Sequence, residues 1–282
     1  MRQQARCSRF HEKFTVATSG SDDPATIEIE DGMQGRGATV ATMVVLSVMI
    51  LAPPAGARNL VQQGRIAVSR CQTINQPGSY RLANNLRATG NCFVISAEGV
   101  TIDLGGFSIT GNGTGTAIIG KPTKAGTIPP ARTVVRNGDI SNFALATNVS
   151  GTVESLRVTD NAKGILVGVG IVRNNIVQSN NAAGIQIADG IVTGNLLVAN
   201  GTGIVVEEAG VITGNQAAGN KAGIDVRGTG STLIGNVADG NGEIGIRVAC
   251  PSNLTNNTAI GNPRNLVLIG KTCRNDGNVF GP

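Results

Sequence analysis

Asparagine positions recur along the chain from Arg132 onward with a period of about 20 residues. One column of asparagines lies at Asn142, Asn161, Asn180, Asn200, Asn220, Asn241 and Asn262. A second column, earlier in each repeat, lies at Asn137, Leu156, Asn175, Asn195, Asn215, Asn236 and Asn257. Such a regular repeat predicts a solenoid, in which each repeat forms one coil stacked on the next.

Apolar residues alternate with other residues in a short segment of each repeat. These segments follow a glycine column, which is expected to close a turn, at Gly164, Gly184, Gly203, Gly223 and Gly245. An aliphatic column adds a second inward position at Val134, Val153, Val172, Val192, Ile212, Leu233 and Leu254. Alternation with a period of two predicts short strands with one face inward. Strands this short can pair only with the next coil, so we predict parallel sheets along one axis.

The asparagine columns have a structural interpretation that needs no ligand. Asparagine tolerates the left-handed backbone region, and its amide can bond to an identical amide above and below it in a stack. We therefore predict asparagine ladders at the corners of the coils.

The repeat is interrupted at residues 120–131, where KPTKAGTIPP is expected to leave the stack as a loop. Insertions into repeat proteins often lie on a binding face, which makes Lys121 and Lys124 candidate ligand contacts. A tolerated surface loop is the simpler interpretation.

An apolar run at residues 38–52 is preceded by Arg36 and followed by prolines and small residues, as in a signal peptide with its cleavage site. We predict a disordered upstream extension over residues 1–32, a signal peptide over residues 33–57 and one β-helix domain over residues 58–282. A membrane-spanning helix needs about 20 apolar residues, so we expect cleavage and no stable span after it. The predicted location is secreted or periplasmic.

Composition limits the chemistry of the predicted domain. The chain has no Trp and one His, His11, which precedes the domain. A Ser/His/Asp triad and the usual zinc ligands are therefore excluded there, and we predict no metal site and no cofactor. Beyond residue 57 there are 18 Lys and Arg against 12 Asp and Glu, a net charge of +6 that favours acidic partners. No basic run with interleaved aromatic residues indicates nucleic-acid binding.

Four cysteines lie in the predicted domain, an even number that favours disulfides in an exported protein. The gap from Cys71 to Cys92 and the gap from Cys250 to Cys273 are each close to one coil. These pairings would join adjacent coils near the two ends. The other two sets of pairings would span the length of the stack, which is too far for a disulfide.

The segment CQTINQPGSY at residues 71–80, followed by Leu82, Leu86 and VTIDL at residues 100–104, resembles the opening module of secreted bacterial parallel β-helix repeat proteins of the pectin-lyase-like superfamily. The likeness covers roughly residues 70–280. It implies a right-handed parallel β-helix of roughly nine coils, about twenty residues each, an extracytoplasmic location and carbohydrate as the ligand class. It does not imply one activity, because a fold hosts many functions.

Known activities of that superfamily make demands that this sequence does not meet. Beyond residue 57 we find no Gly-His-Gly motif of polygalacturonases, no acidic trio of a calcium-dependent lyase and no Asp-Pro motif of the epimerases. Members associated with copper delivery would need Met or His ligands, and the predicted domain contains neither.

Charged residues gather on outward positions of three successive coils. Asp225 is expected one coil from Arg247, and Glu207 one coil from Arg227, at the strand spacing of about 4.8 Å. The Cα atoms of Glu207 and Asp225 would lie about 8 Å apart, within the range of an inverting acid/base pair. The arginines would lower both carboxylate pKa values, whereas a general acid needs a raised pKa.

Two functional hypotheses follow. The first is a non-catalytic binding or structural protein at an acidic polysaccharide or cell surface, with a binding face at Gln186, Arg227, Arg247, Lys121 and Lys124. The alternative is a polysaccharide lyase, glycoside hydrolase or epimerase acting on a uronic-acid polysaccharide, with Glu207 and Asp225 as catalytic candidates. Two cross-strand salt bridges are the simplest interpretation of the same charges. The stack permits homo-oligomers without identifying a contact face.

Overall fold

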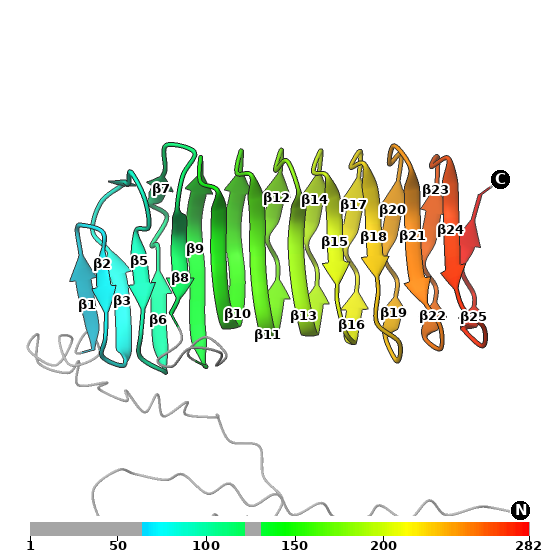
Figure 1. Cartoon of the computed structure of the whole chain (residues 1–282), viewed down its shortest axis with the longest axis horizontal. Helices are drawn as coiled ribbons and strands as arrows, with labels where there is room; N and C mark the ends of the chain where they lie inside the picture. Colours follow the sequence, from blue (N-terminus) through cyan, green and yellow to red (C-terminus); the bar gives the residue numbers. More distant parts are fainter. Residues whose placement is uncertain (1–63, 122–130, 282) are drawn as a thin grey trace, which may run out of the picture. The chain divides into compact units, whose positions relative to one another are not determined.

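The computed structural model describes residues 64–121 and 131–281. These residues form strands and no helix, and each strand pairs in parallel with strands of neighbouring coils (Figure 1). The result is an all-β parallel solenoid of about ten coils with about 20 residues per coil, which confirms the predicted fold class. Right-handed winding stays a prediction.

Each coil passes through three faces. Face 1 contains β2 (Gln72–Ile74), β5 (Phe93–Ile95), β8 (Thr116–Gly120), the first parts of β10 (Leu145–Thr159), β11 (Lys163–Arg173) and β13 (Ala183–Thr193), then β15 (Thr202–Val206), β18 (Ala222–Val226), β21 (Ile244–Ala249) and β24 (Arg264–Ile269).

Face 2 contains β1 (Arg65–Val68), β3 (Gly78–Leu82), β6 (Val100–Asp103), the first part of β9 (Thr133–Ser141), the middle of β10, the later parts of β11 and β13, then β16 (Gly210–Thr213), β19 (Thr232–Ile234), β22 (Asn253–Thr255) and β25 (Arg274–Asp276). Face 3 contains β4 (Leu86–Arg87), β7 (Ser108–Thr110), the ends of β9 and β10, then β12 (Ile176–Gln178), β14 (Leu196–Val198), β17 (Gln216–Ala218), β20 (Val237–Asp239), β23 (Thr258–Ile260) and β26 (Val279–Phe280).

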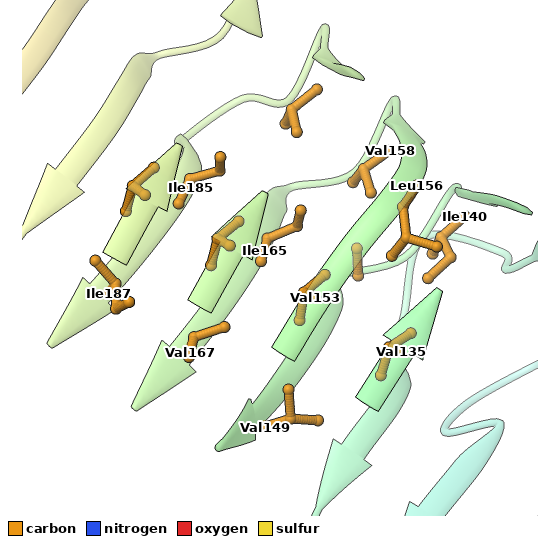
Figure 2. Close-up of a cluster of buried hydrophobic side chains, with 14 of the residues drawn as sticks. Val135, Ile140, Val149, Val153, Leu156, Val158, Ile165, Val167, Ile185 and Ile187 are labelled. Atoms are coloured by element: carbon orange, nitrogen blue, oxygen red, sulfur yellow. The ribbon is translucent and has the colours of Figure 1, made fainter. Parts of the chain in front are cut away.

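Small aliphatic side chains form one core along the axis. Figure 2 shows Val167 and Ile187 in equivalent places on successive coils, and Ile165 and Ile185 repeat in the same way. All four are buried. Parallel pairing places like residues above one another, so aliphatic columns in the sequence become continuous stacks in the core.

Two asparagine ladders link the coils. The backbone N and the Nδ2 of Asn180 donate to Oδ1 of Asn200 at 3.1 and 2.9 Å, and Asn200 donates to Asn220 in the same way. The first ladder consists of Asn161, Asn180, Asn200, Asn220, Asn241 and Asn262. The second consists of Asn175, Asn195, Asn215, Asn236, Asn257 and Asn278. The predicted ladders are confirmed in these coils.

The prediction was wrong by one residue in the coil of residues 132–142. Asn142 is exposed, and the backbone N of Phe143 is the group that donates to Oδ1 of Asn161. Gly138, not Asn137, pairs with Leu156. In the same coil, Val135 rather than Val134 is the fully buried partner of Val153. All three columns are therefore shifted together.

The physical reason is that asparagine has two distinct roles in this chain. Asn137 and Asn142 have φ values of 62° and 61°, so they supply the left-handed residue of a corner. In later coils that position directly precedes the ladder residue and is filled by residues such as Ser179 and Gly219. The ladder asparagines themselves lie one position later, and their role is hydrogen bonding.

The glycine column does not close turns, because these glycines lie at the starts of strands. A Cβ on Gly223 would lie 2.4 Å from the carbonyl oxygen of Gly245 and 2.9 Å from Nδ2 of Asn241. Glycine is thus required for the close approach of the next coil and its ladder amide.

The two predicted disulfides, Cys71–Cys92 and Cys250–Cys273, are confirmed. Each joins adjacent coils, since Gln72 pairs with Phe93 and Asn253 pairs with Arg274. The predicted signal peptide, upstream extension and most of the insertion loop lie outside the described residues and stay predictions. In the described part of the chain, no helix is long and apolar enough to span a membrane.

Replacing Asn200 with Ala is expected to lower the free energy of unfolding by about 1–3 kcal/mol, because buried backbone groups lose their partner. Asn181→Ala is the matched control, since Asn181 is exposed and adjacent to the same ladder. Urea denaturation measures both. Equal stability of the two variants would contradict the ladder.

Replacing Asn142 with Gly is expected to change the free energy of unfolding by less than about 0.5 kcal/mol, because glycine readily adopts the left-handed conformation. Asn161→Gly is expected to cost more than about 1 kcal/mol, since it removes the acceptor of the Phe143 backbone N. The same urea experiment compares the two variants. A larger loss of unfolding free energy for Asn142→Gly than for Asn161→Gly would contradict the backbone role of Asn142 and the hydrogen-bonding role of Asn161.

Candidate functional site

An open groove of about 460 Å³ runs over the outside of face 1, across β11, β13, β15, β18 and β21. Its floor is low because small residues follow one another in register, as Ala183 pairs with Thr202 and Thr202 pairs with Ala222. The strand pairing therefore aligns the groove with the axis of the stack.

One rim of the groove is a column of outward residues on the strands. Gln186 pairs with Val205, Val205 with Asp225, and Asp225 with Arg247, and the last of these pairs is the one that the sequence predicted. The other rim carries charged residues that the sequence analysis missed, namely Lys163, Lys221 and Glu243. Nζ of Lys221 lies 3.5 Å from Oε1 of Glu243.

Asp225 is the most enclosed charged group of the groove, with its side chain 5% exposed. Its Oδ1 accepts a hydrogen bond from Nε of Arg247 at 2.6 Å, and its Oδ2 accepts one from Nη2 of the same guanidinium. Oδ2 also accepts a hydrogen bond from Nε of Arg227 at 3.0 Å. Both carboxylate oxygens of Asp225 are thus held by arginine.

Arg227 connects this cluster to Glu207. Its Nη1 donates to Oε1 and Oε2 of Glu207 at 2.9 and 3.1 Å. Nε2 of Gln186 donates to the same Oε1 at 2.7 Å. The two predicted cross-strand pairs are therefore present, and Arg227 joins them into one network of five side chains: Gln186, Glu207, Arg227, Asp225 and Arg247.

This network determines the protonation state of Asp225. Burial alone would raise the pKa of its carboxyl, but hydrogen bonds and charge from Arg247 and Arg227 outweigh burial and hold that pKa below its ordinary value of 3.8. Asp225 is therefore ionised at neutral pH and cannot serve as a general acid. Since both of its oxygens already accept hydrogen bonds from arginine, it is also poorly disposed to accept a substrate proton.

Lys121, one of the two candidate lysines of the loop, lies away from the groove. Lys121 follows β8, which lies four strands along face 1 from β15, and it does not line the groove. Lys124 lies outside the described residues. Lys163, Lys221 and Glu243 were not predicted because they precede the glycine of their repeats and so lie outside the alternating segments.

A second charged column crosses face 2 and was not predicted. Asp103, Arg136, Glu154 and Arg173 are successive cross-strand neighbours of alternating charge. The shortest contact joins Nη2 of Arg173 to Oε2 of Glu154 at 2.6 Å. Asp103 and Arg136 are separated by more than one repeat of about 20 residues, so the spacing in the sequence did not predict that they pair. Alternating charges of this kind stabilise neighbouring strands.

Neither column provides a ready metal site. No group of three or more His, Cys, Asp or Glu side chains able to hold a metal ion occurs in residues 64–121 or 131–281. Comparisons with protein-family models, with curated proteins and with solved structures found no match. The likeness to pectin-lyase-like proteins therefore stays an expectation from the repeat, and the structure itself establishes the solenoid.

Replacing Asp225 with Asn is expected to destabilise the fold by roughly 1.5–3 kcal/mol at neutral pH, because three hydrogen bonds from arginine lose their charged acceptor. The folded-state pKa of Asp225 is lowered, so its contribution is present above about pH 4 and is lost as the pH falls through the folded-state pKa.

Denaturation of the wild type and the variant at neutral and acidic pH measures this effect. Asp239→Asn is the control, because Asp239 is exposed on β20. A difference between wild type and Asp225→Asn that stays constant down to strongly acidic pH would contradict the ion-pair assignment.

Proposed function

We propose that this chain is an exported β-helix protein that binds an acidic polysaccharide along the groove of face 1 without converting it. The observation that carries the proposal is that Arg227 and Arg247 together donate hydrogen bonds to both carboxylate oxygens of Asp225. It leaves the most enclosed carboxylate of the groove ionised, while the guanidinium groups that hold it remain partly exposed. The arrangement suits recognition of anions better than acid/base catalysis.

The charges on the groove support an anionic ligand. Arg227 and Arg247 have donors beyond those used by Asp225, and guanidinium groups bind carboxylates in planar geometry. Lys163 adds a cation that forms no salt bridge with any described residue. Ligand carboxylates can therefore contact cations at both ends of the groove.

The form of the groove supports a polymer. It extends over five strands, or about 19 Å at the usual strand spacing. Sites for small molecules are typically concave and enclose most of the ligand. An open groove along the axis fits an extended chain that continues beyond both ends.

Export is the third part of the proposal. Two disulfides between adjacent coils are compatible with an oxidising, extracytoplasmic compartment. The apolar run at residues 38–52 supplies the expected signal sequence. A right-handed winding and a place among pectin-lyase-like proteins complete the same hypothesis.

The test is incubation of the purified chain with a panel of uronic-acid polysaccharides, with a neutral polysaccharide as control. Retention of the protein on the polymer is measured together with new reducing ends and the ultraviolet absorbance of unsaturated product. The proposal requires retention on acidic polymers without product. Product formation would establish the enzyme instead, and equal retention on acidic and neutral polymers would contradict charge-based binding.

The double variant Arg227→Ala/Arg247→Ala is expected to weaken retention on the acidic polymer at least about tenfold. This variant also leaves Asp225 without its arginine partners. The double variant Lys163→Ala/Lys221→Ala is therefore a second test, because it keeps the hydrogen bonds of Arg227 and Arg247 to Asp225. The control Arg157→Ala/Lys271→Ala removes the same charge from exposed positions outside the groove. Equal retention by all three variants would exclude face 1 as the binding site.

A further inference from the structure

The last described coil, formed by β24, β25 and β26, ends the asparagine ladder within itself. Strand pairing places Asn265 opposite Gly245, at the position that holds glycine in the preceding coils. Oδ1 of Asn265 accepts hydrogen bonds from the backbone N and the Nδ2 of Asn262 at 3.1 and 2.9 Å. Elsewhere this acceptor comes from the next coil. The Asn265 side chain therefore fills the space that a further stacked coil would use.

The outer edge of this coil is uncovered in the described part of the chain. β24 pairs only with β21, β25 only with β22, and β26 only with β23. Leu268, Ile269 and Val279 are 40%, 52% and 58% exposed, whereas Val248, the neighbour of Leu268 in the preceding coil, is fully buried. An open strand edge beside exposed apolar side chains is a template for pairing with another chain.

The sequence of β25 is complementary to itself. Arg274 and Asp276 continue the outward positions of Asn253 and Thr255, while Asn275 continues the inward position of Leu254. In antiparallel pairing of two β25 strands centred on Asn275, Arg274 of each copy lies directly opposite Asp276 of the other. Parallel pairing in the same register would instead place like charges opposite one another.

We propose that this edge is an interface with a second copy of the chain, formed by antiparallel pairing of β25 about a two-fold axis at Asn275. Such an interface is isologous, so both Arg274–Asp276 pairs form at once. The same rotation brings β24 toward β26 of the partner, which covers Leu268, Ile269 and Val279. The interface lies at the last described coil, away from the groove of face 1, and is independent of polysaccharide binding there.

The test is sedimentation velocity of the full chain, purified without reductant, over a wide range of protein concentration. The wild type is expected to dimerise reversibly. Arg274→Asp and Asp276→Arg are each expected to raise the dimer dissociation constant at least about tenfold, because each places like charges opposite one another in both pairs. The charge-swapped double variant Arg274→Asp/Asp276→Arg restores both pairs and is expected to dimerise like the wild type.

Arg157→Asp is the matched control, since Arg157 is exposed in the middle of face 3. It is expected to leave the dissociation constant unchanged. A wild type that is monomeric at every concentration would overturn the proposal, as would a dimer that survives both single variants. If the double variant has the melting temperature of the wild type but does not dimerise, the antiparallel register is wrong.

Discussion

The hydrogen bond between one asparagine amide and the amide of the next coil is the interaction on which the rest of this structure depends. Apart from Asn262 and Asn278, which donate to Asn265 and Asn275 three residues away, each ladder asparagine accepts from the preceding coil and donates to the following one. It thereby satisfies buried backbone groups at a corner where strand pairing is interrupted. The backbone pairing of the strands brings each amide close to the backbone of the neighbouring coil. Glycine is then required opposite it, as the contacts that a Cβ on Gly223 would make demonstrate.

The candidate site follows from that spacing. Constant separation of the coils keeps outward positions in register, which brings Asp225 between Arg247 and Arg227 and connects Arg227 to Glu207. In the same way, successive small residues on face 1 become a continuous groove. A rigid stack with a fixed charge pattern favours recognition of a repeating anionic polymer. The lowered pKa of Asp225 makes this carboxyl unsuited to be the general acid of a hydrolase.

Periodicity made much of the fold predictable from sequence. The stacked coils and the neighbours Asp225 and Arg247 follow from the period, and both disulfides follow from the period together with the even number of cysteines. The coil of residues 132–142 was misaligned because the sequence does not distinguish an asparagine used for its left-handed backbone, such as Asn142, from one used for its amide. The Arg227 bridge and the lysines of the groove depend on side-chain conformation and on which neighbours are small, so spacing could not predict them.

The most direct test of polysaccharide binding at face 1 is a crystal structure of the chain with a bound uronic-acid oligosaccharide. We expect an intact ligand along face 1, with its carboxylates bound by Arg227 and Arg247 while both arginines still hold Asp225. A ligand bound on another face, or a cleaved ligand with Asp225 released from its arginines and directed at the broken bond, would contradict it.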